Sequence, residues 1–107
     1  MSNIILLSFI FLFAFVSMPQ NKTPDLSKAE DLKMLGTGRI IQKDNSILKN
    51  IHILELNTYW IIYEKNSSSH DMMMDVIARI EFPESKWGAV KLEFPDNKPM
   101  LSKLSYQ

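Results

Sequence analysis

The chain has 107 residues, no cysteine and a formal net charge of zero, with 12 basic and 12 acidic residues. This length suits a single domain, and a neutral chain lacks the basic excess that would direct it to nucleic acid or to anionic lipid. Without disulfides, on which many small exported domains rely, its stability has to come from a packed core or from dimerisation.

The N-terminus begins with an uncharged apolar run over residues 4–16, IILLSFIFLFAFV. Such a run matches the hydrophobic region of a secretory signal and is short for a membrane span. We therefore expect a signal peptide over residues 1–18, a polar linker over residues 19–24 and one β-rich domain over residues 25–107, in a secreted or periplasmic protein. The alternative is an uncleaved leader, which would then be the protein's contact with the membrane.

A short helix is predicted within residues 23–36, TPDLSKAEDLKMLG. Ser27 and Glu30 have the spacing of a capping box, and two leucines share one side of the segment. Gly36 suits the end of the helix because glycine adopts the left-handed conformation there at no steric cost.

After Gly36 the pattern changes to five strands joined by polar turns. The long segment over residues 47–56 alternates imperfectly, which predicts a bulge near Ile53. The next, over residues 58–65, is apolar on both faces, as in a strand that is covered on both sides. The last, AVKLEF over residues 89–94, alternates regularly, and the prolines that follow EF in both of the final two strands are expected to end them. This order predicts an all-β fold, as an antiparallel meander or a small barrel.

The segment HDMMMDVIARIEF, residues 70–82, is interpreted as one of these strands. Its apolar face would hold Met72, Met74, Val76, Ala78, Ile80 and Phe82, and methionine fills gaps in small cores. In a strand His70 shares that face with Met72 and Met74, and imidazole and thioether sulfur suit Cu(I). Packing is the favoured interpretation of this segment, and copper binding through these three residues is the alternative.

Aromatic side chains provide the other candidate site, made of Tyr59, Trp60, Tyr63 and Trp87. Exposed on one face, they would form a stacking platform for a carbohydrate or a protein ligand. Packing of these rings inside the domain is the favoured interpretation, with Tyr59 and Tyr63 facing one layer and Trp60 the other.

Catalytic motifs are missing from the sequence. His52 and His70 lack the HExxH spacing of zinc hydrolases, and the serines at positions 67–69 lack the GxSxG context of a nucleophile. Gly36 and Gly38 belong to no phosphate-binding pattern. We expect no enzymatic activity and no cofactor.

The segment from Gly38 to Phe82 resembles SH3-like and Sm-like small β-barrels in the order of its pieces: a strand, a KDNS turn, two long strands, and MDVIARIEF as a short 3₁₀ turn followed by a strand. The resemblance implies a five-stranded SH3-like barrel. It transfers no site, because the basic RNA-facing turns of Sm proteins and the paired aromatics of peptide-binding SH3 domains are missing. The predicted function is therefore that of an exported binding or structural module for a protein or carbohydrate ligand.

Overall fold

The computed structural model describes residues 24–105, so the expected signal peptide and most of the linker lie outside the described residues. The described part contains one α-helix, seven strands and two 3₁₀ turns. In chain order they are α2 (Ala29–Met34), β1 (Gly38–Gln42), β2 (Ile47–Leu56), β3 (Trp60–Lys65), β4 (Ser68–Met73), η2 (Met74–Val76), β5 (Ile77–Ser85), β6 (Gly88–Glu93), η3 (Pro95–Asn97) and β7 (Met100–Lys103).

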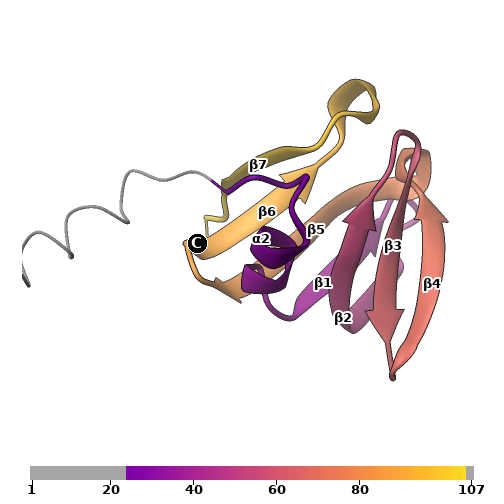
Figure 1. Cartoon of the computed structure of the whole chain (residues 1–107). Coiled ribbons are helices and arrows are strands. Elements are labelled where there is room, and N and C mark those ends of the chain that lie inside the picture. The colour runs from indigo at the N-terminus through magenta and orange to yellow at the C-terminus, as the bar shows by residue number, and fades with distance from the viewer. Residues whose placement is uncertain (1–23, 106–107) are drawn as a thin grey trace, which may run out of the picture.

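The strands form a single antiparallel sheet in the order β4-β3-β2-β1-β5-β6-β7 (Figure 1). The predicted all-β class is confirmed, but the strand number is seven and not five. One additional strand arises because residues 70–82 are divided by η2, and the other because the C-terminal tail pairs with β6. The expected closure into a barrel is not confirmed, because β4 and β7 are the two edges of the described sheet.

The helix begins differently from the prediction, because the capping box between Ser27 and Glu30 does not form. The N-cap is Lys28, without a side-chain cap. Ser27 is engaged elsewhere: its backbone N–H and its hydroxyl both donate to Asp25 Oδ1, at 3.0 and 2.6 Å. Asp25 in turn donates its backbone N–H to Asp31 Oδ2 at 2.6 Å.

The other features predicted for the helix are confirmed. Leu32 and Leu35 are both buried in the hydrophobic core, where they pack this segment against the sheet. Gly36 has a φ of 77°, the left-handed conformation in which glycine ends a helix without strain. Gly38 lies close against the ring of Phe82, and a Cβ at this position would be 2.7 Å from two carbons of that ring.

The turn before β2 and the bulge within β2 also match the sequence. Asn45 has a φ of 72°, and Asp44 accepts the backbone N–H of Ser46 at 2.9 Å, as an Asx turn does. The register between β2 and β3 shifts between Ile53 and Glu55. The extra residue of the bulge leaves both Leu54 and Glu55 exposed and returns Leu56 to the face of the sheet that holds Ile53 and Ile61.

Residues 70–82 do not form one strand, and the apolar face predicted for them is partly wrong. β4 ends at Met73, where the Met74 N–H donates to the Tyr59 carbonyl at 2.8 Å, and η2 then connects β4 to β5. The turn changes the alternation, so Ile77 is buried whereas Val76 is 41% exposed. The short 3₁₀ turn followed by a strand, which the resemblance to small barrels implied, is present at this place.

The core lies on the side of the sheet that α2 covers (Figure 1). Val90 and Leu92 of β6 are buried as their alternation predicts, but Phe94 is only partly buried because the chain leaves β6 there and enters η3. Pro83 does not end β5 as expected. The strand continues to Ser85, and its ladder with β6 becomes irregular between Phe82 and Ser85. The largest fully buried side chains are Leu35, Ile40, Ile51, Ile61, Met74, Ile80, Phe82 and Leu92.

Candidate functional site

The four aromatic residues singled out in the sequence do not share one surface. Tyr59 is 54% exposed and Trp60 is 39% exposed, whereas Tyr63 is 7% exposed and belongs to the core. Trp87 is partly buried against the core at the turn between β5 and β6, three strands away from β3 in the sheet order. The structure therefore keeps Tyr59 and Trp60 as an exposed aromatic pair.

Two apolar side chains that the sequence analysis did not propose extend this pair. Met73 of β4 lies directly opposite Trp60 and is 50% exposed. Leu54 is 40% exposed and is the extra residue of the β2 bulge, between Ile53 and Glu55. We call Leu54, Tyr59, Trp60 and Met73 the β3–β4 patch. Met73 was detectable in the sequence as an apolar residue between Asp71 and Asp75, on the polar side of its strand.

Two shallow hollows lie along β4 beside this patch. One, of about 470 Å³, is lined by Ile62, Tyr63, Ser69, His70 and Asp71, and the other, of about 330 Å³, by Trp60, Asp71, Met72 and Met73. Because side chains alternate along a strand, each hollow is lined by residues from both faces of the sheet. Asp71 belongs to the lining of both hollows.

The three residues proposed for copper have different environments. Met74 is 2% exposed within the core, and Met72 packs partly against it. His70 is exposed and stacks on Tyr63, with ring centroids 5.4 Å apart and an interplanar angle of 28°. The burial of Met74 favours a packing role, and copper binding stays a prediction to be measured.

The second histidine lies apart from the first. His52 Nε2 is 3.1 Å from Thr37 Oγ1, and its register partner is Glu64, on the face of the sheet opposite to that of Tyr63 and His70. Within residues 24–105, no group of three or more His, Cys, Asp or Glu side chains is arranged to hold a metal ion.

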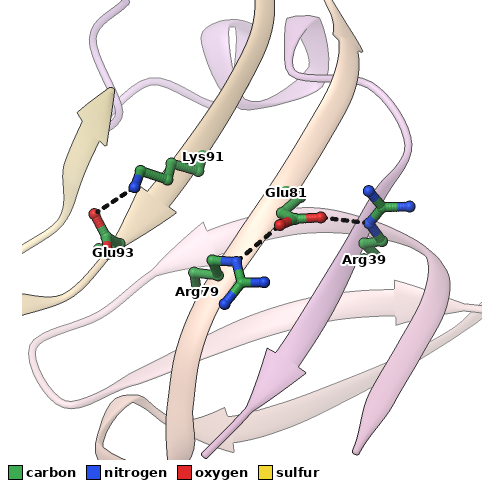
Figure 2. A network of polar contacts seen from close by, with 5 residues as sticks. All are labelled: Arg39, Arg79, Glu81, Lys91 and Glu93. Carbon is green, nitrogen blue, oxygen red and sulfur yellow. Dashed lines mark hydrogen bonds and ion pairs between the residues drawn. The ribbon is translucent and has the colours of Figure 1, made fainter. Parts of the chain in front are cut away.

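One carboxylate is buried in the sheet, that of Glu81 on β5 (Figure 2). It accepts hydrogen bonds from Arg39 Nε at 2.6 Å and from Arg79 Nε at 2.8 Å, one on each carboxylate oxygen. Burial by itself would raise the pKa of Glu81, but the hydrogen bonds and positive charges of Arg79 and Arg39 outweigh burial and lower it. Both oxygens already have a cationic partner, so this network is suited to joining β1 and β5, and no acid–base role is assigned to it.

Comparison with known protein families, with curated proteins and with solved structures finds no match for this chain. Within the described residues, no helix has both the length and the apolar composition needed to cross a membrane.

Proposed function

We propose that this protein is an exported binding module and that the β3–β4 patch is its contact surface. The observation that carries the proposal is the pairing of Trp60 with Met73, two large apolar side chains that are neighbours across β3 and β4 and are both exposed to solvent. Tyr59, next to Trp60 in the chain, and Leu54, in the bulge of β2, are exposed as well. Clustered exposed apolar side chains on a small domain are typical of an interaction surface.

A protein partner is favoured over a carbohydrate by the composition of the patch. Tyrosine, tryptophan and methionine are enriched at protein interfaces, and large aromatics there often contribute most of the binding energy. A sugar platform would use several aromatic rings on one surface, but Tyr63 is inside the core and Trp87 lies at another turn. Leu54 and Met73 supply flexible aliphatic surface instead.

We also propose that β1 to β5 form an SH3-like unit to which β6 and β7 are added. Two observations support this: β1 pairs with both β2 and β5, and the 3₁₀ turn η2 separates β4 from β5. In Figure 1, β5 follows a long curved path from the turn after β4 to β6. An experimental structure in which β5 lacks pairing with β1 would contradict this assignment.

Site-specific photocrosslinking tests the contact surface. A benzophenone amino acid replaces Tyr59 in one variant and Met100 in a matched control, because Met100 is similarly exposed, at 48%, on the opposite edge strand β7. In the native compartment we expect a discrete adduct from position 59 and none from position 100. The captured protein, once purified, should bind the wild type at least about tenfold more tightly than Trp60→Ser, the loss expected for an aromatic hot spot. Equal adducts from both positions, or equal affinities, would contradict the proposal.

A further inference from the structure

The backbone of β4 has unpaired hydrogen-bonding groups along its outer edge. The hydrogen bond from Met74 N–H to the Tyr59 carbonyl sets the phase of the ladder between β3 and β4. Since hydrogen-bonded and non-hydrogen-bonded pairs alternate in an antiparallel ladder, Ser69, Asp71 and Met73 direct their N–H and C=O groups away from β3. Among the described residues no strand pairs with this side of β4.

The two edges of the sheet differ in how well they are protected from further pairing. At the opposite edge β7 has only four residues, follows Pro99 and ends in Lys103, and short strands, proline and lysine are features that natural edge strands use against pairing. β4 instead is six residues long, pairs with β3 without a bulge, and contains neither proline nor lysine. The edge of β4 is therefore open to an added strand.

The side chains around this edge indicate the chemistry of the segment that would fit. On the face of the sheet that points away from the core, Asp71 and Glu55 lie on either side of Ile62. On the same face Glu64 pairs with Ser69. The nearest lysine of β3, Lys65, already donates its Nζ to the Lys49 carbonyl. The other face of β4 presents Met72 and the stacked ring of His70, next to the two hollows.

From these observations we infer that β4 accepts an extended segment of a partner protein as an additional strand, with a lysine or arginine of that segment opposite Asp71 and apolar side chains beside His70 and Met72. The inference rests on the proposed function and specifies the partner's chemistry. Main-chain hydrogen bonds would supply affinity, and the alternate side chains would supply specificity, as in other cases of strand addition.

A second copy of the chain fits this edge less well. Antiparallel pairing of β4 with itself about a two-fold axis has to match residues on the same face. The register that pairs the free hydrogen-bonding groups of all three residues Ser69, Asp71 and Met73 places Asp71 directly opposite Asp71 of the second copy. Like charges directly opposite one another destabilise a strand pair. A basic segment removes this repulsion and replaces it with an attraction.

Calorimetry with the synthetic peptide TVKVKVT tests the inference on the purified protein. We expect the peptide to pair antiparallel to β4, as all strand pairs of the described sheet do, so that its lysine residues share the face of Asp71 and direct their N–H groups towards β4. We expect it to bind at least about threefold more tightly than TVEVEVT, because exposed charge pairs contribute modestly. N-methylation of its two lysine residues removes N–H groups that face β4 and should weaken binding about tenfold or more. N-methylation of two valine residues, whose N–H groups face solvent, should leave the affinity unchanged.

Two protein variants complete the test. Asp71→Lys should reverse the preference towards TVEVEVT, whereas the control Asp75→Asn, in η2 beyond the strand, should behave as the wild type. Three results would each overturn the inference. The first is an equal loss of affinity for the two N-methylated peptides, and the second is no binding of TVKVKVT. The third is a concentration-dependent dimer in sedimentation that excludes the peptide. Retained crosslinking at Tyr59 in such a case would leave the proposed function intact, and its absence would overturn both.

Discussion

Glu81 joins β1 and β5 in the middle of the sheet, and replacing it with glutamine should lower the free energy of unfolding at neutral pH. Its side chain is 10% exposed and holds Arg39 and Arg79 through separate oxygens (Figure 2). A hydrogen bond to a charged group contributes about 1.5–3 kcal/mol. Glutamine keeps one acceptor oxygen, and solvent reaches the arginines, whose side chains are 38% and 42% exposed. We therefore expect a net loss of about 1–2 kcal/mol.

The same substitution should change how stability depends on pH. Because the pKa of Glu81 is lower in the folded protein than its ordinary value of 4.5, the unfolded chain binds this proton more readily. The ionised carboxylate makes its full contribution to the free energy of unfolding when the pH is above the ordinary pKa of 4.5. That contribution is lost as the pH falls through the lower pKa of the folded protein. The difference in stability between the wild type and Glu81→Gln should therefore shrink as the solution is acidified below about pH 4.5.

Urea unfolding followed by tryptophan fluorescence, at neutral pH and at several acidic steps, measures both effects. Glu93→Gln is the matched control, since Glu93 forms a looser ion pair with Lys91 at 3.7 Å and is 34% exposed. This control should cost less than about 0.5 kcal/mol. A loss in Glu81→Gln as small as that of the control, or a difference from the wild type that stays constant through the acid range, would refute the reasoning.

Three further predictions concern the core, the methionines and the leader. Leu92→Ala should cost about 2–5 kcal/mol in denaturant unfolding because Leu92 is fully buried, whereas Lys91→Ala should cost no more than about 0.5 kcal/mol; similar costs would mean that the strand faces are misassigned. The double variant Met72→Leu and Met74→Leu should lose less than about 1.5 kcal/mol and show the same absence of Cu(I) binding as the wild type in titrations against a chelator. Stoichiometric binding that this variant loses would instead establish the copper site. Mass spectrometry of the mature protein should find its N-terminus between Met18 and Lys22, and recovery of the intact chain from soluble cytoplasm would contradict export.

Local chemistry was enough to predict much of the sheet. The alternation around Leu92 predicted which side of β6 is buried, and Gly36 and Asn45 marked two chain reversals because their positions need positive φ. The bulge near Ile53 followed from the imperfect alternation of residues 47–56. These features depend on neighbouring residues in the chain, so the sequence alone contained the information.

The features that were predicted wrongly depend on partners far away in the sequence. The tail becomes β7 only because β6 offers it an edge. The residues after Met73 leave the strand once the Met74 N–H has donated to the Tyr59 carbonyl of the β3–β4 pair, because η2 leads into β5, whose partner is the distant strand β1.

In the candidate site, too, some features were predictable from the sequence and others depended on the tertiary structure. The sequence predicted that aromatic residues near positions 59–63 were candidates for binding, and alternation placed Trp60 and Tyr63 on different faces, but it did not show which face is exposed. The pairing of β3 between β2 and β4 turns Tyr63 into the core and leaves Trp60 outside, next to Met73. That β4 is an edge at all was decided by the tertiary structure, because a strand's free hydrogen bonds depend on which other strands reach it.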